Sequence, residues 1–419
     1  MLSELETLVK KAMNKEKVDG VEVYCNVIEE VTQRTMLDKI ESSEYSLTTG
    51  YSVRVLKDDM MGFAYFDKLS DFEKAVKHAK KSMIPSYGFC FPNERYEKVK
   101  LFDKEVVEFS LDDVYEVINN VVSFFNGKEA RLVQAEVKKV REETFLVNSE
   151  GFSGSYDDAL VSFELSVQKG RSLYYDGEVF KQVPDFNAFT EKVYNDCLLT
   201  AEGKRVSGEY DVIFSKQAVV ELVNYFLGNA LDGEGVFFKQ SFFEGKIGQE
   251  VASFSIYDNP LLDYGGFSYP FDDEGVKAFN KKLIDRGVLK QFIFDLKTSS
   301  RMNTTPTGNA VRRDYQSLPS IELSNVILEP IETISQEDVD GLKVFNFLGL
   351  YEANLLSGDF SFQVDSGCLI EKGEPVKPVS GCTLVGNFFE MIKHAKFVND
   401  FGRKYNYYGP SWVVKLKVV

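Results

Sequence analysis

Histidine, the residue that most often binds zinc or activates a nucleophile, is nearly absent from this sequence. Only two histidines occur among 419 residues. His78 and His394 each lie beside lysines in a helical pattern and off its apolar stripe, so both are interpreted as solvated helix residues rather than ligands or bases. No HExxH or GxSxG motif is present, and no His/Cys cluster has the spacing of a zinc site. The sequence therefore predicts neither a metal centre nor a histidine-dependent nucleophile in this chain.

Closely spaced cysteines and long apolar runs are also missing. The five cysteines form no CxxC pair, and an odd number of scattered thiols in a chain of this length favours reduced cysteines over disulfides. The first six residues are acidic and have no signal-peptide pattern, and no apolar run approaches the length that crosses a bilayer. These features predict a soluble cytoplasmic protein without membrane contact. The cysteines are Cys25, Cys90, Cys197, Cys368 and Cys382.

Clustered positive charge is the third absence. The 49 Lys and Arg residues are outnumbered by 65 Asp and Glu residues, which gives a formal net charge of −16. Neutralising phosphates requires grouped Lys and Arg, so direct binding to nucleic acid is not expected. What the chain does have is apolar material, because 44% of its residues are hydrophobic and 14% are aromatic. This amount excludes extensive disorder and is enough for two or three packed domains.

The hydrophobic periodicity predicts an α+β fold, because helices are separated by runs of strands without regular βαβ alternation. We expect an N-terminal α+β domain over residues 1–98, a middle α+β domain over 99–207, and a sheet-rich C-terminal domain over 208–419 with mostly antiparallel strands. The N-terminal part mixes helices and strands. The predicted strands cover 21–36, 51–55, 62–65, 135–147, 152–156, 160–168 and 210–214.

Several helices are predicted from capping residues and apolar spacing. Ser70 and Glu73 have the spacing of a capping box, and Ser110 is placed to cap the next helix. In the C-terminal part, helices are predicted over residues 215–227, 275–286 and 386–397.

Two polar segments are candidates for ligand contact. The carboxylates of residues 272–274 precede a predicted helix, where they either cap the helix or contact a metal or a peptide amine. The loop over 305–313 ends in two arginines, and it either holds a carboxylate or phosphate or is a turn whose arginines pair with surface acids. These residues alone indicate an acidic cytoplasmic α+β protein without a recognisable catalytic set.

A series of short motifs runs in order along nearly the whole chain. They are SVRV at 52–55, GKIGQ at 245–249, FDDEG at 271–275, TGNAVR at 307–312, SGDFS at 357–361, IEKGE at 370–374 and GN at 386–387. As an ordered set, these motifs resemble the PmbA/TldE branch of the TldD/PmbA family, often described as modulators of DNA gyrase.

The resemblance implies a cytosolic metallopeptidase assembled as a heterodimer. In such a pair, the TldD-like subunit carries a zinc-binding HExxxH helix and a distant cysteine ligand, and the TldE-like subunit lacks them. The HExxxH segment corresponds here to residues 224–229, with Asn224 and Asn229 at the histidine positions and Tyr225 at the glutamate position. A carboxamide is a poor substitute for imidazole on zinc, and a tyrosine cannot act as a base at neutral pH. Residues 402–419 contain no cysteine either.

The resemblance therefore implies a non-catalytic subunit without a metal or cofactor of its own, acting on unfolded or extended peptides beside a zinc-bearing TldD-like partner. Asp272, Glu274, Asn309 and Arg312 are the predicted peptide contacts. The alternative is a stand-alone homodimer that binds peptides or has a regulatory role, with an indirect effect on DNA gyrase. A metal-independent hydrolase would need a nucleophile and a base that the sequence does not show.

Overall fold

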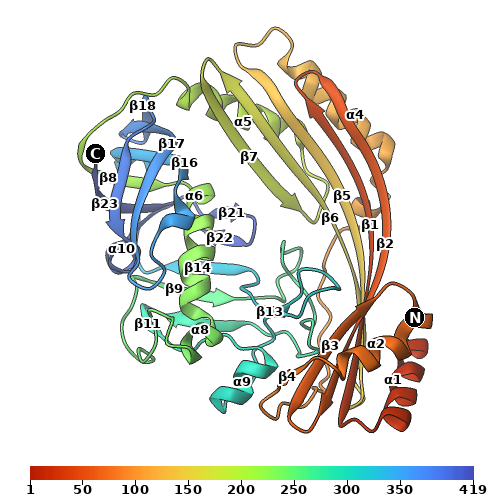
Figure 1. Ribbon diagram of the computed structural model, residues 1–419. Helices are drawn as coiled ribbons and strands as arrows, with labels where there is room; N and C mark the ends of the chain where they lie inside the picture. Colours follow the sequence, from red (N-terminus) through yellow and green to blue (C-terminus); the bar gives the residue numbers. More distant parts are fainter.

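One curved antiparallel sheet makes up the first half of the molecule. The computed structural model describes residues 1–419. The strands of this sheet are β1 (Gly20–Met36), β2 (Lys39–Lys57), β3 (Met60–Phe66), β4 (Met83–Pro85), β5 (Arg131–Asn148), β6 (Ser153–Lys169) and β7 (Ser172–Phe180). They lie in the order β4-β3-β2-β1-β5-β6-β7. Figure 1 shows this sheet as a long wall that faces the C-terminal half.

Helices cover the sheet where its apolar side chains emerge. In β6, every second residue from Ala159 to Val167 is buried, which is the period-two pattern of a strand with one covered face. The helices of this half are α1 (Leu2–Glu16), the 3-10 turn η1 (Leu69–Asp71), α2 (Phe72–Ala79), α3 (Lys104–Glu108), α4 (Leu111–Phe125) and α5 (Phe186–Thr200). The pair α4 and α5 packs on β5, β6 and β7, whereas α1 and α2 pack near the other end of the wall.

The strand predictions for this half are confirmed in position, but the observed strands are longer. The predicted strands over 152–156 and 160–168 are one continuous strand, β6. Strands from before and after residue 98 lie in this one sheet, because β1 pairs with β2 on one side and with β5 on the other. The chain leaves this sheet through α5.

The two capping predictions have different outcomes. Ser110 caps α4 as predicted, and its capping box is completed by Asp113. The capping box at Ser70 is wrong, because residues 69–71 form a 3-10 turn and α2 has no side-chain cap. The carboxylate of Glu73 instead pairs with two lysines of α1, each at 2.8 Å. These two ion pairs to α1 occupy the carboxylate that the predicted capping box required.

The second half contains two larger sheets and one two-stranded ribbon, β12 (Ala310–Val311) with β13 (Ser320–Ile321). The six-stranded sheet contains, in spatial order, β11 (Val288–Leu289), β10 (Lys281–Asp285), β9 (Phe254–Asp258), β14 (Val326–Pro330), β22 (Tyr407–Gly409) and β21 (Gly402–Lys404). The eight-stranded sheet contains β8 (Gly208–Phe214), β15 (Thr333–Ile334), β16 (Gly341–Leu348), β17 (Asp359–Glu371), β18 (Glu374–Val379), β19 (Thr383–Asn387), β20 (Lys396–Val398) and β23 (Trp412–Val418).

The eight-stranded sheet partly closes on itself. Strand β23 pairs with both β19 and β8, so β23, β19, β17, β16 and β8 form a ring. Most pairings in the chain are antiparallel; β8 with β16, β14 with β22 and β15 with β20 are parallel. The prediction of a sheet-rich α+β fold with mostly antiparallel strands is confirmed. Two short 3-10 turns, η3 (Gln336–Asp338) and η4 (Leu350–Glu352), connect strands here.

Two helix predictions in this half need correction. Residues 275–286 are not a helix; they contain a turn, an isolated bridge between Phe271 and Lys277, and then β10. The carboxylates of residues 272–274 therefore do not cap a helix that follows them in sequence, although Glu274 accepts from the N–H of Leu296 at 2.7 Å. The helix predicted over 386–397 is limited to α10 (Phe388–His394) and is followed by β20. Both segments contain strands because β10 pairs with β9 and β20 pairs with β23. Apolar spacing along the segments alone did not indicate these pairings.

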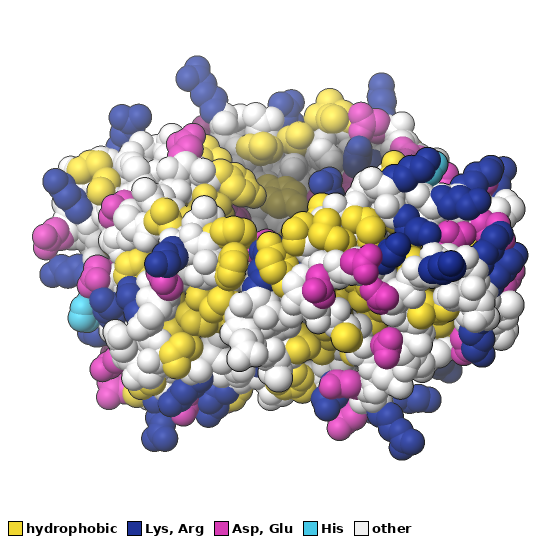
Figure 2. Space-filling view, turned by 60° about the horizontal axis from the view of Figure 1, so that its bottom comes forward, with side chains coloured by type: hydrophobic (Ala, Val, Ile, Leu, Met, Phe, Trp, Pro, Cys, Tyr) yellow, Lys and Arg dark blue, Asp and Glu magenta, His cyan; other side chains and the backbone are white.

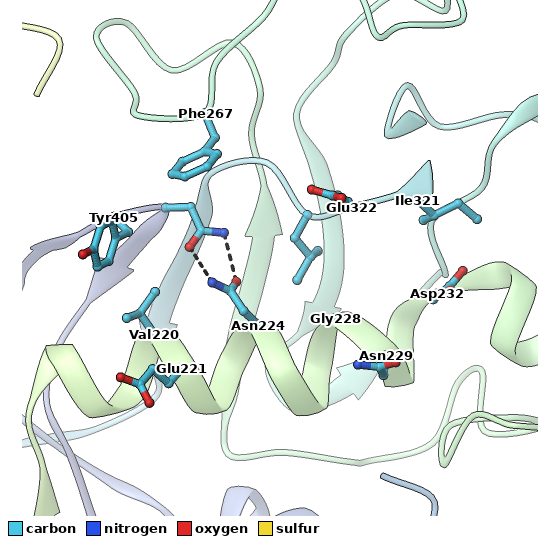
Figure 3. Close-up of a pocket in the computed structure, with 12 residues that line it drawn as sticks. Val220, Glu221, Asn224, Gly228, Asn229, Asp232, Phe267, Ile321, Glu322 and Tyr405 are labelled. Carbon is cyan, nitrogen blue, oxygen red and sulfur yellow. Dashed lines mark hydrogen bonds between the residues drawn. The ribbon is translucent and has the colours of Figure 1, made fainter. Parts of the chain in front are cut away.

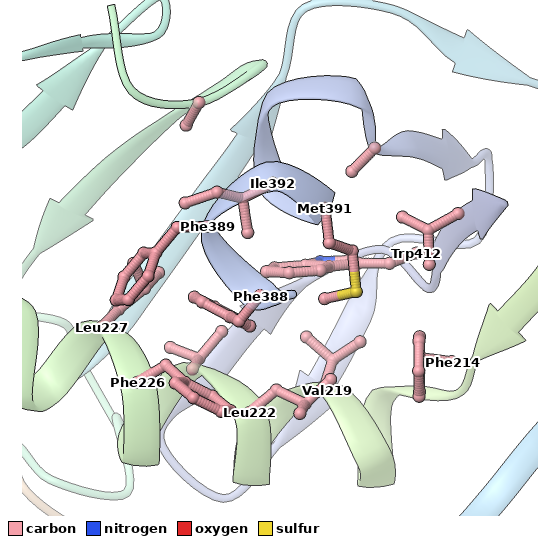
Figure 4. Close-up of a cluster of buried hydrophobic side chains, with 14 of the residues drawn as sticks. Phe214, Val219, Leu222, Phe226, Leu227, Phe388, Phe389, Met391, Ile392 and Trp412 are labelled. Atoms are coloured by element: carbon pink, nitrogen blue, oxygen red, sulfur yellow. The ribbon is translucent and has the colours of Figure 1, made fainter. Parts of the chain in front are cut away.

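The core of the second half surrounds a single long helix. It begins after Ser215, whose side chain accepts from the backbone N–H of Ala218, and runs through α6 (Lys216–Leu222), η2 (Val223–Leu227) and α7 (Gly228–Leu231). A shorter helix, α8 (Gly233–Phe237), follows, and α9 (Leu296–Met302) packs against it. Figure 4 shows the long helix burying Leu222 and Phe226 against α10 and Trp412. The rings of Phe226 and Phe388 stack with centroids 4.4 Å apart.

None of the helices is both long and apolar enough to span a lipid bilayer. The face shown in Figure 2 is hollowed at its centre, and hydrophobic side chains gather around the hollow.

Candidate functional site

The segment that corresponds to the HExxxH motif lies at an irregularity of the long helix. Residues 223–227 form a π-helical turn, in which the N–H of Gly228 donates to the carbonyl of Val223. In a regular α-helix, residues five apart lie about 140° apart around the axis. A π turn closes i→i+5 hydrogen bonds, so it returns residues five apart to nearly the same face. Asn224 and Asn229 consequently line the same cavity.

This cavity has a volume of about 450 Å³ and lies above the long helix (Figure 3). Its walls come from four parts of the chain: the helix with its C-terminal end, the loop that carries Phe267, the segment that follows β12, and the C-terminal segment between β21 and β22. No histidine, cysteine, lysine or arginine is among its lining residues. They are Val220, Glu221, Asn224, Gly228, Asn229, Asp232, Phe267, Ile321, Glu322, Leu323, Tyr405 and Asn406.

Asn224 is held by a reciprocal pair of carboxamide hydrogen bonds. Its Nδ2 donates to Oδ1 of Asn406 at 3.0 Å, and Nδ2 of Asn406 donates back to Oδ1 of Asn224 at 3.0 Å (Figure 3). Asn406 is buried, and its Nδ2 also donates to the carbonyl of Ser324 at 3.1 Å. The pair therefore connects the helix to the C-terminal segment without any charge.

The other two motif positions do not converge on Asn224. Asn229 is exposed, and its Nδ2 donates to the carbonyl of Tyr225 at 2.6 Å within the helix. The phenol of Tyr225 is directed away from the cavity, toward the carbonyl of Ala353 at 3.5 Å, and its ring packs edge-on to Tyr351. A tyrosine placed here cannot orient a water molecule over the two asparagines.

The side chains present do not fit a catalytic zinc ion. Such a site needs imidazole, thiolate or carboxylate ligands at tetrahedral positions. The two motif positions offer neutral carboxamides, and the oxygen of Asn224 is already the acceptor of Asn406. No group of three or more His, Cys, Asp or Glu side chains in the chain is arranged to hold a metal.

Two carboxyl groups of the cavity have raised pKa values. Burial raises the pKa of Glu221 to about 7, against a smaller opposing effect of Lys404. Burial also raises the pKa of Asp232 to about 6, although this side chain accepts from the N–H of Glu234 at the start of α8. A third carboxylate, Glu322, is exposed at the rim. The cavity thus has three acidic side chains and no Lys or Arg among its lining residues.

The two polar segments over residues 272–274 and 305–313 lie outside this cavity. Both contribute side chains to a buried ionic cluster between the two halves of the chain. Arg54 of β2 donates from Nε and Nη2 to the carboxylate of Glu22 in β1, at 2.8 and 2.7 Å, and its Nη1 pairs with Glu274. Arg312 reaches the same Glu22 carboxylate at 3.0 Å. The carboxylates raise the pKa of Arg54 against the opposing effect of burial, whereas burial and Arg54 lower the pKa of Arg312.

The neighbouring acids have interior roles. Asp272 accepts from the N–H of Ala310, and burial together with Glu274 raises the pKa of Asp272 well above its ordinary value. Asp273 accepts from the N–H of Arg312 at 2.6 Å, and burial raises its pKa to about 7. These carboxylates organise loops of the second half around the arginine cluster.

Three of the four predicted peptide contacts, Asp272, Glu274 and Arg312, are thus buried in or beside this cluster. Asn309 is also buried, and its Nδ2 donates to Asp258 at 2.8 Å and to the carbonyl of Glu322 at 2.9 Å. All four side chains are engaged within the protein, so they are not carried into the function proposed below. Asn309 nonetheless positions the strand segment that borders the cavity.

The acidic side chains of the cavity could hardly be found by sequence reasoning. Glu221 and Asp232 flank the HExxxH segment by three residues on either side, which is the one local signal they offer. Glu322 lies some ninety positions further along the chain and is brought there only by the ribbon of β12 and β13.

Comparison with known proteins agrees with the ordered motifs. The model of the PmbA/TldA metallopeptidase C-terminal domain matches residues 207–419, and the model of PmbA/TldA metallopeptidase domain 1 matches residues 21–82. An uncharacterized protein of Methanocaldococcus jannaschii is 27% identical over 91% of each chain. A metalloprotease TldD homolog of Buchnera aphidicola (subsp. Schizaphis graminum) is 25% identical over 86% of this chain and 81% of its own.

Two crystal structures have the same fold. TldE from Thermococcus kodakarensis superposes with a TM-score of 0.88 at 21% identity, over 99% of this chain and 100% of that one. A protein of Thermotoga maritima described as a candidate modulator of a DNA gyrase superposes with a TM-score of 0.89 at 22% identity, over 100% and 99%. Because the C-terminal model alone matches more than half of the residues, the chain belongs to the PmbA/TldD family, a family of TldD/TldE-type metallopeptidases.

Proposed function

We propose that this chain is the zinc-lacking, non-catalytic TldE-like subunit of a cytosolic TldD/TldE-type metallopeptidase. The observation that carries the proposal is the pair of asparagines at the two histidine positions of the HExxxH segment. Both line one cavity, as two ligands would, yet Asn224 is committed to a neutral carboxamide pair with Asn406. Tyr225 occupies the position of the activating glutamate, and its hydroxyl is directed toward the carbonyl of Ala353.

In this role the chain works with a TldD-like partner that supplies the zinc and the water-activating glutamate. The substrates are unfolded or extended peptides, and this subunit contributes part of the surface that encloses them. The isolated chain is expected to have no peptidase activity, because a carboxamide neither binds zinc tightly nor accepts a proton at neutral pH.

The test is affinity purification of the tagged chain from its own host, followed by mass spectrometry and zinc analysis. We expect equal amounts of a second protein that carries an intact HExxxH helix, about one zinc per pair, and peptide cleavage by the pair alone. The isolated chain should retain no zinc after gel filtration.

Three outcomes would overturn the proposal. Recovery of the chain only with itself would favour a homodimer with a binding or regulatory role. A full equivalent of zinc on the isolated chain, or chelator-resistant cleavage by it, would show that the chain is not a metal-free supporting subunit.

A further inference from the structure

The curved sheet of the first half is covered unevenly along its two margins. At β7, the carbonyls of Tyr175, Gly177 and Val179 accept from side chains of the second half. At the opposite margin, which Figure 1 shows away from the second half, β3 covers only the part of β2 that begins at Tyr51. Residues 42–49, the open edge of the sheet, pair with β1 alone and have no strand on their other side.

The direction of the backbone groups along the open edge follows from the neighbouring strands. The N–H of Ser149 donates to the carbonyl of Val21, so the odd-numbered residues of β1 are directed toward β5. The even-numbered residues of β1 are therefore directed toward β2, where their partners are also even-numbered. The bond from the N–H of Asp19 to the carbonyl of Leu56 agrees with this direction. The N–H and C=O groups on the open side belong to Ser43, Tyr45, Leu47 and Thr49.

Two large apolar side chains of the open edge lie on the face of the sheet that α4 covers. Tyr45 is opposite Val31, which is buried in one cluster with apolar residues of α4. Leu47 follows Tyr45 by two positions and therefore lies on the same face. Tyr45 is 63% exposed and Leu47 is 62% exposed. Both side chains thus extend the apolar face beyond the cover that α4 gives.

The flank of α4 on this side is apolar as well. Helix α4 packs on β1 and β5, and its Phe124 contacts Tyr194 of α5, which lies over β6 and β7. Leu111 and Tyr115 lie on the opposite flank of α4, and both are exposed. An uncovered apolar strip therefore lies between α4 and the open edge. Its side chains are Tyr45, Leu47, Leu111 and Tyr115.

The open edge lacks the features that protect edge strands from other chains. Natural proteins protect such strands with prolines, lysines, bulges or a short length. Strand β18, an edge strand of the second half, contains Pro375, Lys377 and Pro378. Residues 42–49 contain no proline, glycine or lysine, and their register with β1 is unbroken. Such an edge is able to pair with an additional strand.

The charge pattern of the open edge fits a second copy of the same edge. Glu44 is the only charged residue within 42–49. In an antiparallel pair with a two-fold axis at Tyr45, Glu44 lies opposite Ser46 of the partner subunit, so no carboxylates face each other. The same axis places the apolar strips of the two copies side by side. A two-fold interface requires this kind of self-complementary surface.

We propose that two copies of this chain associate through the open edge, so that their two curved sheets form one continuous antiparallel sheet about a two-fold axis at Tyr45. The apolar strips of both copies form the side-chain contact beside the joined strands. The inference does not depend on the function proposed above, since no residue of the open edge lines the cavity over the long helix. Equal amounts of a zinc-bearing subunit would then give two copies of each.

The test measures the mass of the purified full-length chain by sedimentation equilibrium at micromolar concentrations. We expect a reversible equilibrium between monomer and dimer. Leu47→Lys should weaken dimerisation at least about tenfold, because the two-fold axis brings two charges into the apolar contact. Leu173→Lys is the matched control, since Leu173 is 49% exposed and lies in β7 at the other margin of the same sheet. A monomer at every concentration, or equal effects of the two substitutions, would overturn the proposal.

Pairing through the backbone is tested with Leu47→Pro. This substitution removes an N–H on the open side, whereas pairing with β1 uses the N–H groups of Ser46 and Thr48. We expect the variant to keep the circular dichroism spectrum of the parent and to lose the dimer. A folded Leu47→Pro variant that still dimerises would exclude pairing along the open edge.

The position of the axis is tested by cross-linking, which requires no destabilised variant. Tyr45→Cys, combined with Cys90→Ser to remove the exposed thiol, places two cysteines opposite each other at the axis. We expect mild oxidation to give a disulfide-linked dimer of this variant. Leu173→Cys in the same background should remain monomeric on a denaturing gel. Equal cross-linking at both positions, or none at position 45, would overturn the proposed axis.

Discussion

Arg312, from the second half of the chain, reaches Glu22 in the first strand at 3.0 Å, and neither side chain is exposed to solvent. The two residues are 290 positions apart, and Arg54 shares the same carboxylate. Buried charges of this kind need partners, because an uncompensated charge in the interior costs several kcal/mol. The relative position of the two halves is thus linked to an ion cluster as well as to apolar contact.

Replacing Arg312 should therefore destabilise the protein strongly. We expect Arg312→Ala to lower the free energy of unfolding by about 3 kcal/mol or more, because it leaves the buried carboxylate of Glu22 without one of its two arginine partners. Arg313→Ala is a matched control, since this neighbouring arginine is exposed, and its effect should stay within about 0.5 kcal/mol. Urea unfolding monitored by tryptophan fluorescence measures both. Equal effects of the two substitutions would show that the buried cluster contributes little.

Asp273 should make stability depend on pH. Its folded-state pKa is raised by burial to about 7, well above the ordinary value of 3.8. A carboxyl with a raised pKa in the folded state contributes most to stability below its unfolded pKa, and this contribution is lost as the pH rises from about 4 through about 7. Asp273→Asn should therefore gain stability relative to the parent between pH 5 and 8, by on the order of 2–4 kcal/mol. Unfolding curves at several pH values test this, and a constant difference across the range would contradict it.

The π-helical turn should make the degenerate motif convertible into a metal site. The double variant Asn224→His, Asn229→His places two imidazoles at one cavity that also contains Asp232. We expect it to bind zinc at least about tenfold more tightly than either single variant, since two ligands on the same face act together. Competition titrations with a chromogenic chelator provide the measurement. If the double variant is no better than the singles, the two positions do not share a face in solution.

Phe226 is the side chain on which the long helix is anchored. It is fully buried and stacks on Phe388 with an interplanar angle of 9°. Phe226→Ala should lower the free energy of unfolding by about 3–5 kcal/mol, because it removes buried surface and leaves a cavity. Phe401, which is 62% exposed, is the control, and Phe401→Ala should change stability by less than about 0.5 kcal/mol. A similar loss at both positions would argue against this anchor.

Several local features were predictable because their signals lie within one segment. The alternation over residues 21–36 predicted β1, and Ser110 predicted the start of α4. The helix over 275–286 was wrong, since its apolar residues are used by the turn before β10 and by that strand. Ser70 was wrong for a related reason: its intended partner Glu73 pairs with α1. In both cases a contact distant in sequence outweighed a local preference.

The sequence by itself determined the family and the missing zinc ligands, because these depend on residue identity at ordered positions. It also determined the α+β class, because periodicity depends on neighbouring residues only. The tertiary structure decided which polar residues face a cavity and which are buried. Asp272 and Arg312 are part of the family motifs yet lie in the interior, whereas Glu221 and Glu322 line one cavity although they are far apart in sequence. Burial and long-range pairing are properties of the packed chain, and no local pattern encodes them.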